Sequence, residues 1–248
     1  MRIGAQLYTV REYTQTQKDF ADTIKKISQI GYDLVQASAV GAVIPPSEIA
    51  ETCKAYNIKV TLTHTNPDRI LKDTERVIDE HHLMGAKYVG IGSLPAGYSK
   101  DKDGYRRFIT DYIPVARALK ESGLQLLYHN HAFEFEKIDG VLALDYMYDK
   151  FADLNFTLDT YWIQAGGADP AYWIKKYGER VDVLHLKDYA IVNGEPRNAE
   201  VKEGNLNWDA IMEAASAAGV EYGMVEQDDC YGRDPFESLR ISFNNLRG

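Results

Sequence analysis

The sequence has few of the features that mark secreted, membrane-spanning or redox-active proteins. Its 248 residues include two cysteines, Cys53 and Cys230, which form no CxxC pair and suit reduced thiols in a reducing compartment. No apolar run approaches the ~20 residues that span a bilayer. The N-terminal MRIGAQLYT lacks the basic start and long apolar stretch of a signal peptide. We therefore expect a cytoplasmic protein without a membrane partner, and leave open a native leader removed from a precursor.

Positively charged residues are also outnumbered, with 28 Lys and Arg against 37 Asp and Glu. The formal net charge is −9, so a large polyanion would be repelled and nucleic acid is not an expected partner. A small neutral or singly charged ligand remains compatible, because local fields differ from the net charge. The hydrophobic content of 45% is ample for a core.

Strand-like and helix-like segments alternate along the whole chain. The helical periodicity is clearest at Phe20, Ile24, Ile27 and Ile30. Eight strand-like runs lie between such segments, at residues 3–9, 33–38, 58–64, 87–93, 124–131, 154–160, 181–187 and 222–227. This pattern predicts a single-domain α/β fold over residues 1–248, a (β/α)8 TIM barrel. A doubly wound sheet is the alternative, but LYTVREY after the first strand lacks its glycine-rich phosphate turn.

Smaller features fit the same alternation. Asn207 is placed to begin a helix over residues 207–219, and residues 68–85 form another segment of helical periodicity. Four glycines precede strands as helix-ending residues, which gives them a structural role: Gly31, Gly85, Gly123 and Gly219. Cys53 is expected in the core, and His81 and His82 are expected in solvent on a charged helix.

Three carboxylates and one imidazole close, or closely follow, consecutive strand-like runs. These residues are Glu134, Asp159, His185 and Glu226, at intervals of 25, 26 and 41 residues (159−134, 185−159 and 226−185). The shorter intervals match one strand-helix unit, and the longest contains a loop insertion. Active sites of α/β barrels lie at the carboxyl ends of the strands. The four side chains are therefore expected at one site.

Strand parity supports three of the four. In VDVLHLK, His185 and Lys187 share a face opposite Leu184 and Leu186, so they should point into the barrel. The same alternation points Asp159 in LNFTLD and Glu226 in YGMVE inward. Glu134 lies beyond its strand, where parity says little.

Such a donor set is hard and rich in oxygen. It suits one divalent ion, Mn²⁺, Mg²⁺ or Co²⁺, and Zn²⁺ also fits. The ion would polarise a sugar carbonyl, and carboxylates would move the proton on the neighbouring carbon. Glu134 and Glu226 form the natural pair, because the strands of Asp159 and His185 lie between theirs.

A set of short motifs then resembles a known family. The motifs run through nearly the whole chain and are strongest from Leu124 onward: YHNHAFEF, LDTYWIQAGG, HLKD, EGNLNWDAI and YGRDPFESLRIS. Together they closely resemble the sugar phosphate isomerase/epimerase family, the xylose isomerase-like barrels that include ketose 3-epimerases, inosose dehydratase and the apurinic endonuclease.

The resemblance implies metal ligands at Glu134, Asp159, His185 and Glu226. The chain departs from the ketose 3-epimerases at the fifth strand, where their glutamate is replaced by His129-Asn130-His131. The nearest glutamates are Glu134 and Glu136, and HNHxxE favours Glu134, as in the dehydratase-like branch.

Further side chains are assigned to the substrate. His64, His129, Asn130 and His131 are expected to contact substrate oxygens, with a structural hydrogen bond as the alternative for His64. Lys187 is expected to protonate or stabilise an enolate oxygen, with a salt bridge to Asp188 or another nearby acid as its alternative. Glu203 is expected in a lid, and Arg233 is expected to hold an anionic group, with an ion pair as its alternative. Three aromatic residues could form a wall for the sugar ring or pack between helix and barrel: Tyr161, Trp162 and Trp173.

These observations favour a metal-dependent sugar isomerase or epimerase. A lyase acting on an inosose or a 3-keto sugar is the alternative, because both reactions begin by removing a proton next to a carbonyl. A nuclease is disfavoured by the net charge and by only six histidines, and a non-catalytic sugar-binding barrel would not need a Lewis acid. The expected partner is a small sugar or sugar derivative, and a homo-oligomer stays open.

Overall fold

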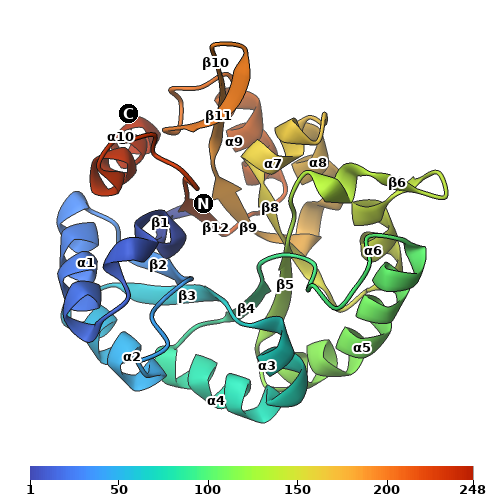
Figure 1. Ribbon diagram of the computed structural model, residues 1–248, viewed down its shortest axis with the longest axis horizontal. Helices are drawn as coiled ribbons and strands as arrows, with labels where there is room; N and C mark the ends of the chain where they lie inside the picture. The colour runs from blue at the N-terminus through green and yellow to red at the C-terminus, as the bar shows by residue number, and fades with distance from the viewer. Residues whose placement is uncertain (248) are drawn as a thin grey trace.

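The computed structural model describes residues 1–247 and forms a closed barrel of eight parallel strands inside a ring of helices (Figure 1). Around the barrel the strands follow the order β1-β12-β9-β8-β5-β4-β3-β2. Their bounds are β1 (Arg2–Gln6), β2 (Leu34–Ala37), β3 (Lys59–His64), β4 (Tyr88–Ile91), β5 (Gln125–His129), β8 (Asn155–Asp159), β9 (Val181–Leu186) and β12 (Tyr222–Val225).

The predicted barrel is confirmed, and the doubly wound alternative is excluded because the first and last strands pair. Arg2 lies opposite Tyr222, and Ala5 lies opposite Val225. Seven of the eight predicted runs contain one barrel strand each, and the first, 3–9, overlaps β1, which begins one residue earlier at Arg2 and ends at Gln6. The sequence did not predict two small antiparallel hairpins, β6 (Lys137–Ile138) with β7 (Val141–Leu142) and β10 (Asp188–Val192) with β11 (Glu195–Ala199). The second pair occupies the insertion between β9 and β12.

Helices cover the outside of the barrel. Their bounds are α1 (Gln17–Ile30), α2 (Pro46–Ala55), α3 (Pro67–Lys72), α4 (Thr74–Met84), α5 (Lys102–Glu121), α6 (Ala143–Lys150), α7 (Thr160–Ala165), α8 (Pro170–Tyr177), α9 (Trp208–Ala217) and α10 (Pro235–Arg247). Three 3₁₀ segments are η1 (Leu7–Tyr13), η2 (Phe133–Phe135) and η3 (Gly178–Arg180). None of the helices within residues 1–247 combines the length and hydrophobicity needed to span a bilayer.

Local signals begin and end these helices. Asn207 caps α9 as predicted, because its side chain accepts a hydrogen bond from the backbone N–H of Ala210 at 3.1 Å. Gly31 ends α1 in the left-handed region, at φ 118°. The predicted helical segment 68–85 is divided at Asp73, whose backbone leaves helical geometry at φ −129° and ψ 41°.

Two histidines on α4 differ in their surroundings. His82 is exposed as expected, but the prediction for His81 was wrong, because its side chain is buried. The Nδ1 atom of His81 lies 2.6 Å from the carbonyl oxygen of Val77, and its Nε2 atom lies 2.8 Å from the Thr63 hydroxyl. Val77 and His81 are one helical turn apart, and this face of α4 packs against the barrel. The charged residues around His81 in the sequence therefore gave a wrong prediction of its exposure.

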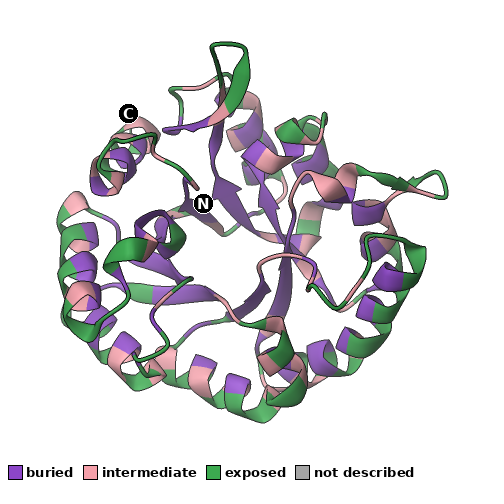
Figure 2. Ribbon diagram, viewed as in Figure 1, coloured by how far each residue is buried: buried purple, intermediate pink, exposed green. Residues whose placement is uncertain are grey.

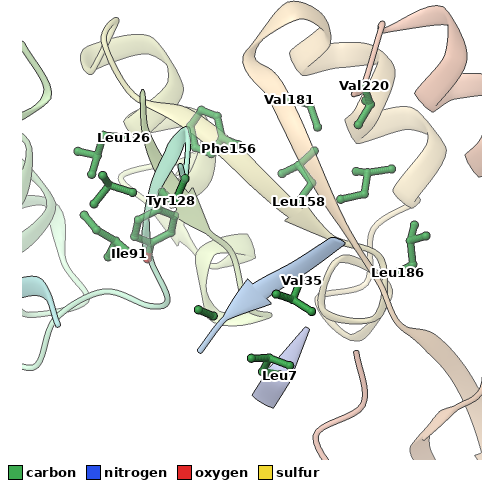
Figure 3. Packing of buried hydrophobic residues seen from close by; sticks show 14 of the residues in the cluster. Leu7, Val35, Ile91, Leu126, Tyr128, Phe156, Leu158, Val181, Leu186 and Val220 are labelled. Carbon is green, nitrogen blue, oxygen red and sulfur yellow. The ribbon is translucent and has the colours of Figure 1, made fainter. Parts of the chain in front are cut away.

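Buried hydrophobic side chains form two clusters. Figure 2 shows that the strands are mostly buried and that the outer sides of the helices are exposed. The larger cluster fills the space between strands and helices, where Leu126, Tyr128, Phe156 and Leu158 point outward from their strands (Figure 3). Cys53 belongs to this core as expected. The smaller cluster fills the barrel itself and consists of Leu62, Tyr88, Leu127, Val183 and Met224. It closes the barrel beneath the carboxyl ends of the strands.

Candidate metal centre

Four buried side chains converge at the carboxyl end of the barrel: His129, Asp159, His185 and Glu226. Their potential ligand atoms all lie within 4.8 Å of one another. His129 ends β5, Asp159 ends β8, His185 lies near the end of β9, and Glu226 follows β12 directly. Sheet register brings them together, because Asp159 lies opposite His185 on the neighbouring strand.

The hydrogen bonds of His185 leave one ring nitrogen free for a ligand. Its Nε2 atom lies 2.7 Å from Oε1 of Gln36, a carbonyl oxygen that can only accept, so Nε2 carries the proton. Nδ1 then presents a lone pair to the site, 2.8 Å from Oε2 of Glu226. Neither of these two buried atoms takes part in a hydrogen bond, although Oε2 of Glu226 forms an ion pair with the Lys187 ammonium at 3.0 Å. Two acceptors facing each other in this way require a cation or a proton between them.

His129 is oriented by the same logic. Its Nδ1 atom lies 2.9 Å from the carbonyl oxygen of Gly92, so Nδ1 donates, and Nε2 faces Oδ2 of Asp159 at 3.2 Å. A partner on the remote ring nitrogen that fixes the tautomer is characteristic of metal-binding histidines.

Asp159 divides its two oxygens between structure and site. Oδ1 accepts the backbone N–H of Trp162 at 2.9 Å and thereby caps α7. The backbone N–H of Asp159 donates to Oδ1 of Asn130 at 3.0 Å, which fixes the end of β8. Oδ2 remains for the site, so this residue is both a helix cap and a candidate ligand.

A lysine completes the charge cluster. The buried ammonium of Lys187 lies 3.1 Å from Oδ2 of Asp159, 3.0 Å from Oε2 of Glu226 and 2.8 Å from Oδ2 of Asp228. Strand parity predicted the inward direction of Lys187, and its contacts with the three carboxylates confirm it. The Thr160 hydroxyl contacts both the carbonyl and the backbone N–H of Lys187, which holds this end of the strand in place.

The cluster shifts the pKa of Asp159, Glu226 and His185. Burial alone would raise the pKa of Asp159 and of Glu226, but the Lys187 ammonium and the imidazoles outweigh it and hold both well below their usual range. Burial would lower the pKa of His185, yet Glu226 and Asp159 raise it to about 9. In the absence of a metal ion, a proton on His185 therefore offsets part of the carboxylate charge.

These residues fit a divalent ion. The site offers two imidazole nitrogens and two carboxylate oxygens, and a bound ion would displace the proton from Nδ1 of His185. Three carboxylates, those of Asp159, Glu226 and Asp228, minus one ammonium leave a formal charge of −2 when both histidines are neutral. A divalent cation would balance it.

A cavity of about 310 Å³ opens onto two of the four donors. Its wall is formed by Tyr8, Ser38, Ala39, His64, Gly92, Ser93, His129, His131, Glu226 and Asp228. The volume is that of a small-molecule pocket. A larger groove of about 810 Å³ lies beside Ile58 and Lys59 at the opposite end of β3, between α2 and α4. None of the four clustered donors lines it, so chemistry rather than size locates the site.

Comparison with known proteins agrees with this fold. Residues 24–233 match the model of the xylose isomerase-like TIM barrel family. The chain belongs to this family. No functionally curated protein matches the sequence at a significant level.

Solved structures of this xylose isomerase-like fold are similar over the whole chain. A sugar phosphate isomerase/epimerase from Parabacteroides distasonis is 21% identical, with a TM-score of 0.84 over 99% of this chain and 93% of the other. An L-ribulose 3-epimerase is 16% identical, with a TM-score of 0.76 over 99% and 93%. The IOLI protein, solved with a bound zinc atom, is 13% identical, with a TM-score of 0.72 over 99% and 96%. At these identities the likeness shows the shared barrel.

The structure separates Glu134 from the other three residues of the predicted quartet. Glu134 lies in η2 and is fully buried. Its Oε1 atom accepts the Tyr128 hydroxyl at 2.5 Å, and its Oε2 atom accepts the backbone N–H of His131 at 2.8 Å. His129 occupies the position in the cluster that the sequence assigned to Glu134. Glu136, the alternative, is exposed.

The predicted substrate residues divide into two groups. His64, His129 and His131 line the cavity. Burial lowers the pKa of His131 to about 3, so its imidazole is neutral at physiological pH. Asn130 is buried away from the cavity wall and orients Asp159 instead.

Glu203 and Arg233 point elsewhere. The exposed Glu203 carboxylate accepts the side-chain amide of Asn245 at 2.9 Å, on the side of α10. Arg233 forms the ion pair that was its alternative, at 3.2 Å from Oε1 of Glu200. Neither lines the cavity that contains Glu226.

The aromatic residues also divide. Trp173 packs between helix and barrel, with ring centroids 5.1 Å from Phe135. Trp162 lies at the site, 5.1 Å from the His131 ring and 5.7 Å from the Lys187 ammonium. Sequence reasoning gave no role to Gln36 or Asp228. The available signal for Gln36 was the alternation of side chains at the end of β2. For Asp228 it was the two-residue spacing from Glu226 in EQD after β12.

Proposed function

We propose that this protein is a divalent-metal-dependent sugar isomerase or epimerase that removes a proton next to a substrate carbonyl. The observation that carries the proposal is the convergence of His129, Asp159, His185 and Glu226, with both imidazole tautomers fixed toward the same point. The names of the similar structures, a sugar phosphate isomerase/epimerase and an L-ribulose 3-epimerase, support the sugar assignment.

His129, Asp159, His185 and Glu226 would hold the ion. With two nitrogen donors the set favours Mn²⁺, Co²⁺ or Zn²⁺ over Mg²⁺, which prefers oxygen. The zinc atom in the IOLI protein is in keeping with this preference. When bound, the ion supplies a Lewis acid that polarises a carbonyl group.

The chain's own residues bind the sugar and move the proton. We assign proton transfer to Glu226, because its carboxylate lines the cavity as well as being one of the four candidate ligands. The neutral His131 and His64 can exchange hydrogen bonds with substrate hydroxyls from the same wall. Contacts with three carboxylates raise the pKa of Lys187, so it acts as a positive charge beside a developing oxyanion rather than as a base.

Elimination is the second candidate, and the position of Glu134 favours it. A two-base epimerisation needs a second acid on the opposite face of the substrate. Glu134 cannot serve, because it is buried and accepts two hydrogen bonds. In an elimination, Glu226 would remove the proton next to the carbonyl and return it to the oxygen of the departing substituent as the C–O bond breaks, so one acid-base group is enough.

A substrate panel in D₂O tests the proposal. The protein would be loaded with Mn²⁺ or Zn²⁺, offered keto sugars, aldoses, inososes and 3-keto glycosides, and followed by NMR. We expect deuterium at the carbon next to the carbonyl and a reduction in rate of about 10²–10⁴ for Glu226→Gln. An unsaturated product would assign the lyase. Neither exchange nor turnover by the metal-loaded protein on any member of the panel would refute the proton-abstraction mechanism.

A further inference from the structure

The Lys187 ammonium contacts the same oxygens that the candidate metal centre offers to an ion. Oδ2 of Asp159 faces His129 at 3.2 Å and the ammonium at 3.1 Å. Oε2 of Glu226 faces His185 at 2.8 Å and the ammonium at 3.0 Å. One cation belonging to the chain therefore already lies on both carboxylates.

Burial makes this contact strong. The side chains of Lys187, Asp159 and Glu226 are at most 5% exposed, so water screens their charges very little. Without the ammonium, two buried carboxylates would face each other with only the imidazoles between them, an arrangement of like charges that proteins avoid. Lys187 thus stabilises the metal-free site, and the same charge must repel an incoming divalent ion.

We propose that Lys187 is a built-in counter-cation, which neutralises Asp159 and Glu226 in the metal-free protein and competes with a divalent ion for them. The proposal rests on the metal centre of the proposed function and adds a control on its affinity. The third contact explains how the lysine yields. Asp228 lies 2.8 Å from the ammonium on the cavity side, with 35% of its side chain exposed, and can retain it when an ion takes the other two carboxylates.

Lys187→Met tests the competition. Binding of Mn²⁺ and of Zn²⁺ alone would be measured by isothermal titration calorimetry on the metal-stripped protein, together with thermal unfolding. We expect the variant to bind each ion at least ~10-fold more tightly than wild type. Its metal-free form should unfold at a lower temperature, and each ion should raise that temperature by more than it does in wild type.

Two further variants keep the test decisive. Lys187→Arg retains the charge and should bind the ions no more tightly than wild type. Lys187→Gln removes the charge while keeping a polar group, and it replaces Lys187→Met if the metal-free methionine variant does not fold. Equal or weaker binding by the uncharged variants would overturn the competition and make Lys187 a residue that positions the ligands. If neither wild type nor these variants bind either ion, the metal centre and the proposed function both fail.

Asp228→Asn tests the retaining contact. Without this carboxylate the ammonium has only Asp159 and Glu226 as partners, so it should compete harder and weaken ion binding. The loss in affinity should be larger in the wild-type background than in Lys187→Met, where only the direct charge effect remains. An equal loss in both backgrounds would refute the role of Asp228 as the retaining partner.

Discussion

Four strands of the barrel each place an apolar side chain inside it and, two residues later, a polar one. The apolar layer contains Leu62, Leu127, Val183 and Met224, and the polar layer contains His64, His129, His185 and Glu226. Side chains two residues apart point to the same face of a strand, so both layers point into the barrel. The lower layer excludes water from beneath the site, and this strengthens the electrostatic interactions of the upper one. The side chains that pack the barrel and those of the candidate site are thus two residues apart on the same strands.

Truncating the apolar layer should have the largest effect on stability. Leu127 is fully buried, so Leu127→Ala should reduce the free energy of unfolding by about 2–5 kcal/mol, through lost burial and a cavity. Urea unfolding measures the change. Metal affinity per folded molecule should stay within about threefold of wild type, because the donors lie in the other layer.

The matched control is Leu83→Ala on α4. Leu83 is 57% exposed, so its truncation should change stability by no more than about 0.5 kcal/mol. A loss of stability for Leu127→Ala as small as for this control would contradict tight packing of the apolar layer beneath the site.

The pH dependence of stability should show that Glu134, which is buried outside the polar layer, has a structural role. Burial raises the pKa of Glu134 to about 7 from an ordinary 4.5. The folded protein then binds more protons than the unfolded chain between these values, so stability falls as pH rises from 4.5 to 7. At about 1.36 kcal/mol per pH unit, the contribution of Glu134 is at most about 3 kcal/mol.

Glu134→Gln should flatten that decline, as measured by urea unfolding at several pH values. Glu136→Gln, at an exposed position two residues away, is the control and should leave the slope unchanged. An equal slope in wild type and Glu134→Gln would show that Glu134 is ionised in the folded protein throughout this range.

The smallest expected effect tests how the polar layer is oriented. Gln36 accepts from Nε2 of His185, and Gln36→Leu should weaken Zn²⁺ binding about 10–100-fold by freeing the wrong tautomer. Gln36→Glu keeps an acceptor and should retain tighter binding than Gln36→Leu. Titration calorimetry with Zn²⁺ measures both, and identical affinities for the two variants would exclude a role for this hydrogen bond.

Much of the barrel and part of the site could be predicted because both depend on local periodicity. Alternation within β9 and β12 was enough to point His185 and Glu226 inward, and the spacing of strand-helix units placed Asp159 beside them. The β10–β11 hairpin was missed because EPRNA, with its proline and charges, does not resemble a strand. This segment pairs with DYAIV because the turn between the two brings them together as an antiparallel hairpin.

The side chains beyond the strand ends required the tertiary structure. His129 and Glu134 are five residues apart, and no period decides which one reaches the cluster. The chain leaves β5 directly after His129, and η2 turns Glu134 back onto the Tyr128 hydroxyl and the His131 backbone. Lys187 has the same dependence, because its three carboxylate partners come from β8 and from the segment after β12.

The sequence by itself determined the closed barrel and the inward direction of Asp159, His185 and Glu226, because a two-residue period is a property of each strand alone. The tertiary structure decided that His129 completes the four-residue cluster, that Glu134 is buried outside it, and that a lysine lies among the carboxylates. Those outcomes depend on contacts between strands and loops that are far apart in the chain, and such contacts leave no periodic pattern in the sequence.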